Sequence, residues 1–246
     1  MDRMGGMSMP VGDITPELVL IAGSVAVLLL ALTVRRDRQR WPAWAALGVL
    51  AATAASTVVM LGGEQSYTFF DTYTTDDAAV LGKLVVLAVT ALTVLLSVEW
   101  MAADRRSGEY YALLLLSALG AVVLAGAADL MELVLGILLS SVTGYVLASY
   151  HRSSPRSTEA GVKYYLLGAL TNAGLLYGVV LLFGLAATTT YAGLAAELVG
   201  KDPVALIAGA VLVVVGVTFK LGAVPAHPWV PDVAEGDDGH HPVAGL

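Results

Sequence analysis

Seven long apolar stretches limit what this chain can fold into. A helix needs about 20 apolar residues to cross the hydrocarbon core of a bilayer. The chain is 57% hydrophobic and 13% charged, whereas soluble domains average about 45–50% and about 25%. The sequence therefore predicts an all-α, polytopic membrane protein. We expect spans at Leu18–Val34, Trp41–Leu61, Ala78–Val98, Tyr110–Ala127, Leu130–Tyr150, Val162–Ala187 and, from Pro203 onward, a broken seventh.

The positive charges of the loops predict their side of the membrane. Arginines follow the first, third and fifth spans, within positions 35–40, 105–106 and 152–156. The loops after the second, fourth and sixth spans hold no basic residue except Lys201. Cytoplasmic loops carry an excess of Lys and Arg. We therefore expect a multi-pass protein of the cell inner (plasma) membrane, with the arginine loops in the cytoplasm and the N-terminus outside.

Composition excludes several kinds of chemistry. The absence of cysteine excludes thiolate-ligated iron–sulfur clusters, disulfides and cysteine nucleophiles. The formal net charge is -7 and the basic residues fall in short loops, so we expect no nucleic-acid partner. The tail Asp237–His241 lacks the ligand spacing of a zinc site, so we expect no metal centre.

The end of the seventh span carries the strongest functional signal. Lys220 is followed by prolines at positions 225, 228 and 231, with His227 between the first two. Proline disfavours helix in its own and the preceding residue, so we expect the helix to end near residue 222 or 223. A charge at membrane depth costs about 2.5–3.5 kcal/mol, and non-helical backbone there needs protein or water around it. The stretch predicts an ion or proton path; the alternative is a lysine that reaches to the cytoplasmic surface.

Four more polar side chains are candidates. Lys163 opens the sixth span, where its position favours an interfacial anchor over a path residue. Lys83 lies one to two turns inside the third span, and we interpret it as an anchor at the outer interface. Glu132 lies about a turn inside the fifth span, either as an outer-rim carboxylate or as a weak path candidate. His227 is suited to relay protons near neutral pH or to bond backbone freed by the prolines.

Two stretches together resemble a known family. EAGVKYYLLGAL (Glu159–Leu170) and GVTFKLGAVPAHPWVPDVAEG (Gly216–Gly236) are similar to the proton-conducting antiporter-like subunits of respiratory complex I, in particular NADH-quinone oxidoreductase subunit N. The second stretch follows the family pattern FKL-x-x-VP-x-H-x-W-x-PDVYEG. The resemblance implies a fold of fourteen transmembrane helices with two inverted repeats. We then expect this chain to be the N-terminal half, with residues 1–109 as a three-helix region and 110–246 as an incomplete first repeat.

The resemblance also implies roles. Lys220 matches the central lysine of the family's broken helix, Lys163 the lysine that opens the sixth helix, and His227 the histidine that connects lysines along a polar axis. It implies a proton-translocating subunit of an NADH:quinone oxidoreductase without a redox centre or cofactor of its own. NADH and quinone would be used elsewhere in the complex, and the partners would be other membrane subunits and lipid.

Two departures from the family pattern leave alternatives open. The family carries a glutamate in the fifth helix at the position of Leu138, and Glu132, six residues away, lies about 9 Å along the axis and on another face. After Glu235 and Gly236, where the family pattern continues as AP-x-PV, this sequence has DDGHHPVAGL instead. The alternatives are a subunit of a multi-chain cation/proton antiporter or membrane hydrogenase, and a non-conducting structural paralogue.

Overall fold

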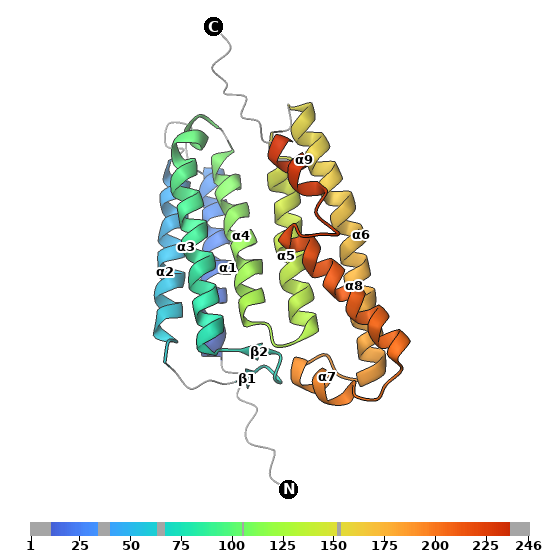
Figure 1. Cartoon of the computed structure of the whole chain (residues 1–246). Coiled ribbons are helices and arrows are strands. Elements are labelled where there is room, and N and C mark those ends of the chain that lie inside the picture. The colour runs from blue at the N-terminus through green and yellow to red at the C-terminus, as the bar shows by residue number, and fades with distance from the viewer. Residues whose placement is uncertain (1–10, 34–39, 63–66, 105, 152–153, 237–246) are drawn as a thin grey trace. The chain divides into compact units, whose positions relative to one another are not determined.

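The computed structural model describes residues 11–33, 40–62, 67–104, 106–151 and 154–236. Within these ranges seven helices are long and apolar enough to cross a membrane (Figure 1). This confirms the predicted all-α membrane fold. The seven helices are α1 (Thr15–Thr33), α2 (Trp41–Val59), α3 (Asp77–Trp100), α4 (Ser107–Gly126), α5 (Leu130–Ala148), α6 (Pro155–Ala186) and α8 (Pro203–Leu221).

The chain folds into two compact units. Unit 1 holds Met1–Ser140 and Thr188–Ala195, and unit 2 holds Ser141–Ala187 and Ala196–Leu246. The division falls inside α5, so one continuous helix contributes to both units. The division expected between residues 109 and 110 follows the family repeat, and it stays a prediction.

Helix starts follow local capping. α6 begins at Pro155, earlier than the expected Val162, because the Ser154 side chain accepts a hydrogen bond from the Ser157 N–H and proline suits the first helical position. α8 begins at Pro203 as predicted, with the Asp202 side chain accepting from the Val204 N–H. The sequence did not predict two features of the loops, the short helix α7 (Tyr191–Glu197) and the hairpin of β1 (Tyr67–Thr68) and β2 (Tyr73–Thr74).

Unit 1 is built on the first four helices. α1 packs against α2 and α4, and α3 packs against the same two helices. Small residues let the backbones approach closely, as at Gly108, where an added Cβ would lie 2.2 Å from the Cβ of Ala31. Close approach through small residues is the usual way in which membrane helices associate.

Loops at one end of unit 1 are joined by backbone pairing. Tyr73 pairs with Ala127, and Asp129 pairs with Thr190. The buried Asp129 accepts hydrogen bonds from the Met131 N–H at 2.6 Å and from the Thr189 hydroxyl at 2.5 Å. The expected tight turn around Asp129 is therefore present, and it also holds the segment that precedes α7.

Unit 2 is organised around α6. Both α8 and α9 (Trp229–Gly236) pack against this helix. In Figure 1, α8 runs along α6 and stops part-way, and α9 continues towards the end at which α6 begins.

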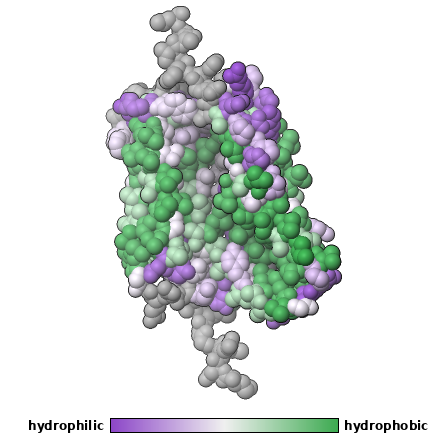
Figure 2. Space-filling model, in the orientation of Figure 1, coloured by the Kyte–Doolittle hydropathy of each residue, from purple (hydrophilic) through white to green (hydrophobic). Residues whose placement is uncertain are grey.

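The surface of the helices is largely apolar away from their ends, where hydrophilic residues gather (Figure 2), as expected for helices that face lipid.

Candidate proton path

The seventh span ends where the sequence predicted. α8 stops at Leu221, and Gly222 adopts a left-handed conformation with φ of 64°, which glycine adopts without a Cβ penalty. The amide protons of Gly222 and Ala223 bond back to the carbonyls of Phe219 and Thr218. The indole N–H of Trp229 donates to the Phe219 carbonyl at 3.2 Å. Helix-end carbonyls that would otherwise lack partners at the break are thereby satisfied.

The break lies well inside the length of α6. This helix has 32 residues and is therefore about 48 Å long. Gly209 of α8 packs against Gly178, and the Phe219 ring stacks on the Tyr164 ring with centroids 5.7 Å apart. Tyr164 is nine residues into α6, so the break lies about 14 Å from its start. Lys220 is therefore alongside the body of a spanning helix and not beyond its end.

Three aromatic rings close the break against α6. The Trp229 ring stacks on Tyr164 at 4.3 Å and lies 5.5 Å from Phe219. Phe219 has no exposed surface and Tyr164 is buried. This cluster holds α8 and α9 on one helix although the chain between them is not helical. Phe219 and Trp229 stood in the family pattern, but sequence reasoning gave them no role.

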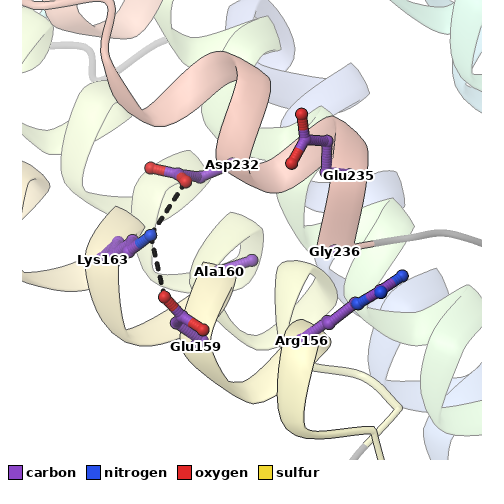
Figure 3. A pocket seen from close by; sticks show the side chains of 7 residues that line it. All are labelled: Arg156, Glu159, Ala160, Lys163, Asp232, Glu235 and Gly236. Carbon is purple, nitrogen blue, oxygen red and sulfur yellow. Dashed lines mark hydrogen bonds and ion pairs between the residues drawn. The ribbon is translucent and has the colours of Figure 1, made fainter.

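Lys163 of α6 binds two carboxylates. Its ammonium lies 2.9 Å from Glu159 on the same helix and 2.9 Å from Asp232 on α9 (Figure 3). Arg156 and Glu235 line the same hollow of about 210 Å³. The side chain of Lys163 is 44% exposed, so the two ion pairs are open to water and screened by it. Asp232 was not among the predicted site residues, although it also belongs to the motif.

The predicted path residues share one unit but do not contact one another. Lys220 is half-buried in the last turn of α8, and it makes no ion pair with any residue that the structure describes. His227 is exposed in the connection between α8 and α9, and its carbonyl accepts the Val230 N–H at 3.0 Å. No hydrogen bond or ion pair joins Lys163, Lys220 and His227 within the described ranges. Their role as one path stays a prediction.

The fifth-helix residues belong to unit 1. Glu132 is half-buried in the first turn of α5, and Leu138 lies six residues further along the same helix. The charge of Glu132 helps to raise the pKa of Tyr73, after burial and the carboxylate of Glu17. Glu132 thus belongs to the electrostatic surroundings of a loop tyrosine of unit 1, and its place in a proton path stays a prediction.

The interpretation of Lys83 as an interfacial anchor is wrong. Its side chain has no exposed surface, and its ammonium lies 2.9 Å from Glu17 in the first turn of α1. The ring of Tyr73 lies 4.8 Å from the same nitrogen. The position of Lys83 near the start of a helix predicted an anchor at the membrane interface. Instead, the carboxylate of Glu17 on α1 pairs with its charge inside the protein. Sequence reasoning missed Glu17 and Tyr73, and the one signal was a carboxylate next to the first apolar stretch.

The membrane helices have known relatives. The family model described as "NADH:quinone oxidoreductase/Mrp antiporter, TM" matches residues 127–238. NADH-quinone oxidoreductase subunit N of Sphingopyxis alaskensis is 42% identical over 224 residues, which are 91% of this chain and 46% of that protein. The resemblance to the antiporter-like membrane subunits is confirmed. The chain spans about half the length of the curated relatives that it matches.

Solved structures agree with this family. A chain of respiratory complex I from Thermus thermophilus is 28% identical with a TM-score of 0.73, covering 89% of this chain and 47% of that one. A chain of the Mrp complex from Dietzia sp. is 21% identical with a TM-score of 0.75, covering 93% and 44%. The Mrp likeness concerns the fold alone. Seven membrane helices with the last one broken are therefore an antiporter-like arrangement.

Proposed function

We propose that this chain acts as a membrane subunit of a proton-translocating NADH:quinone oxidoreductase in the inner membrane, with its arginine loops in the cytoplasm. The subunit N relatives support this kind of complex. The observation that supports proton conduction is the position of Lys220, which is half-buried at the end of α8 and lies alongside α6. Its partners would be other membrane subunits. NADH and quinone would react elsewhere, because the proposed role of this chain needs no redox cofactor.

The proposed path uses protonation and release at side chains along unit 2. A half-buried lysine beside non-helical backbone can lose its proton more readily than an exposed one, because burial disfavours the charged form. Lys163 would exchange protons with the water that reaches its two carboxylates, and His227 would relay between the lysines. Because Asp232 ties α9 to Lys163, a change of charge on Lys163 would also loosen α9 from α6.

Replacement of Lys220 tests this proposal. In the complete subunit, assembled in its complex in membrane vesicles, Lys220→Ala should lower NADH-driven proton translocation by about tenfold or more, while the amount of assembled complex stays unchanged. The readout is the quenching of a pH-sensitive dye, divided by the rate of NADH oxidation. Lys201→Ala is the matched control, since Lys201 is an exposed lysine just before the same helix. Normal translocation with Lys220→Ala would remove Lys220 from the mechanism.

A non-conducting structural role is the second candidate. It is favoured by Leu138, which stands where the family has a glutamate, and by the absence of a described carboxylate partner for Lys220. Purified protein reconstituted in liposomes would then conduct no protons, and Leu138→Glu would introduce conduction. Conduction by the native sequence would exclude this role.

An antiporter subunit would instead conduct protons only in exchange for another cation on the opposite side.

A further inference from the structure

One tyrosine of α6 lies near the middle of the membrane span. Tyr177 comes 15 residues after Val162 and 10 residues before Ala187, the limits of the predicted apolar stretch. At about 1.5 Å per residue it is about 22 Å from one limit and about 15 Å from the other, within a hydrocarbon core of about 30 Å. Tyrosines of membrane proteins usually lie at the interface, where the hydroxyl meets water. The phenol of Tyr177 is too short to reach water from this depth.

The side chain of Tyr177 is not covered by its own unit. The residue is 60% exposed, and its hydroxyl makes no hydrogen bond with any residue that the structure describes. Lipid tails offer no hydrogen-bond acceptor, so a phenol that faces them keeps an unsatisfied donor, which costs free energy. We therefore expect this face of α6 to be covered by a group that can accept the hydrogen bond.

The residues around Tyr177 do not suit a water-filled cavity. Its nearest neighbours on the exposed face of α6 are Ala173 and Val180, one turn away on either side, and Leu176. A water molecule inside a protein needs two to four polar partners. These apolar side chains supply none, so a protein group is the better candidate for the acceptor.

The same face allows a helix to approach closely. Ala169, Ala173 and Tyr177 follow one another at intervals of four residues, so they form one row on the helix surface, and all three are exposed. Further along, nothing lies within 4 Å of a Cβ built on the exposed Gly184. Small residues at such spacing let the backbones of two membrane helices approach closely. The row thus combines a steric feature with the unpaired phenol.

The exposed face of α3 in unit 1 differs from this row. Its exposed large side chains before the last residue, Trp100, are aliphatic, namely Leu81, Val85, Val89, Leu92, Leu95 and Leu96. The hydroxyls of Thr90 and Thr93 bond back to carbonyls of their own helix, which a tyrosine side chain cannot do. Lipid alone can therefore cover the face of α3 without leaving a polar group unpaired.

We propose that the row Ala169, Ala173 and Tyr177 on α6 is the contact face for a transmembrane helix of a neighbouring membrane subunit. That helix is apolar and carries one hydrogen-bond acceptor, to which the phenol of Tyr177 donates. The proposal rests on the part of the proposed function that makes this chain a subunit of a membrane complex. It does not depend on proton conduction, since a non-conducting subunit would use the same face.

Photo-cross-linking in the assembled complex in native membranes identifies what covers the face. Photoreactive p-benzoylphenylalanine replaces Tyr177 in one variant and, as a control, Val89 of α3, which is 59% exposed. We expect position 177 to cross-link to a transmembrane peptide of a different subunit, identified by mass spectrometry, and position 89 to cross-link only to lipid. A cross-link from position 177 to lipid alone, or to any part of this polypeptide or of a second copy, would overturn the proposal.

Point variants separate the polar contact from the steric one. Tyr177→Phe removes only the hydroxyl and should weaken the association by about threefold to tenfold. The readout is the fraction of the cross-linked subunit that stays bound to the tagged chain as detergent is increased. Tyr165→Phe is the control, because Tyr165 is also exposed, at 54%, but lies near the start of α6, where water reaches the phenol.

The steric variant is Ala173→Leu, which should weaken the association at least as much as Tyr177→Phe by keeping the two helices apart. Ala88→Leu on the exposed face of α3 is its control and should have no effect. Equal retention of the subunit in both α6 variants and both controls would contradict the proposal.

Failure of this inference can be told apart from failure of the proposed function. If translocation depends on Lys220 but position 177 cross-links to lipid alone, the proposed function stands and the contact face is wrong. If position 177 cross-links to a neighbouring subunit while Lys220→Ala leaves translocation normal, the contact face stands and the proposed role of Lys220 fails.

Discussion

Two lysines on apolar helices show different ways to keep a charge in a membrane protein. Lys83 in unit 1 has no exposed side-chain surface and is neutralised by Glu17 at 2.9 Å, with the Tyr73 ring beside it. Lys220 in unit 2 is half-buried in the last turn of α8 and has no ion pair with a described residue. Lys83 relies on a partner from another helix, whereas Lys220 lies next to a gap in its own helix.

The charge of Lys83 is held by a fixed partner, whereas the charge of Lys220 can change without leaving a buried counter-charge behind. Removing one member of a buried pair leaves the other uncompensated, which costs about 3–5 kcal/mol. An unpaired lysine leaves nothing behind when it is removed. Lys83 should therefore be needed for stability, and Lys220 should be dispensable for stability and needed for translocation.

The largest effect is expected for loss of a single member of the buried pair. Lys83→Met should lower the free energy of unfolding by about 3–5 kcal/mol, because it leaves the Glu17 carboxylate buried without its cation. Lys220→Met should change it by about 1 kcal/mol or less. Denaturant unfolding followed by circular dichroism in detergent measures both. Equal losses for the two variants would break the contrast.

An intermediate loss of stability is expected when alanine replaces either of two glycines, Gly126 beside the Tyr73 ring or Gly222 at the end of α8. At Gly126 a Cβ would overlap the Tyr73 ring, and Gly126→Ala should cost about 1–3 kcal/mol by overpacking. At Gly222 the φ of 64° disfavours any Cβ, so Gly222→Ala should cost about 1–2 kcal/mol. The same unfolding measurement ranks them. Gly48→Ala is the control, since nothing lies within 4 Å of its added Cβ.

A smaller loss of stability is expected when the hydrogen bond from Trp229 to the Phe219 carbonyl, at the end of α8, is removed. Trp229→Phe keeps an aromatic ring against Tyr164 but removes the N–H that donates to the Phe219 carbonyl. The loss should be about 1 kcal/mol of stability. Hydrogen exchange of the last turn of α8, followed by mass spectrometry, should become faster in this variant. Unchanged exchange would show that the Gly222 N–H, which also donates to this carbonyl, holds the last turn without the indole.

The smallest effect is expected for the exposed pair of Arg40 and Glu99. The two charges lie 3.7 Å apart with side chains 61% and 85% exposed, and such pairs contribute about 0–1 kcal/mol. Arg40→Gln should therefore change the unfolding free energy by less than about 1 kcal/mol, and salt should remove even that change. A loss comparable to that of Lys83→Met would mean that burial does not separate the two pairs.

Much of the fold could be predicted from the sequence because membrane helices are set by local composition. The apolar lengths gave the seven spans, and the three prolines gave the end of α8 at Gly222. The early start of α6 was missed because its capping residues, Ser154 and Pro155, lie in a polar stretch before the apolar run. The hairpin of β1 and β2 was missed because each strand has only two residues, too few to show the alternating pattern of a strand.

The site was harder to predict because it depends on pairs of distant residues. The motif pointed to Lys163, Lys220 and His227, but the ion pair from Lys163 to Asp232 required α9 to fold back on α6. Lys83 was misread because its partner Glu17 lay just outside the expected first span, which began at Leu18. Which charges meet across helices is decided by tertiary packing, and no local pattern in this chain carried that information.

The pairing of α1 with α3 through Glu17 and Lys83 has a consequence for biogenesis. During synthesis α1 and α2 are both made before α3, the helix that carries the counter-charge, appears. A lone carboxylate inside a nascent helix opposes insertion by about 2.5–3.5 kcal/mol at mid-depth and by less near the surface. We therefore expect the first helix to settle fully in the bilayer only after the third has emerged from the ribosome.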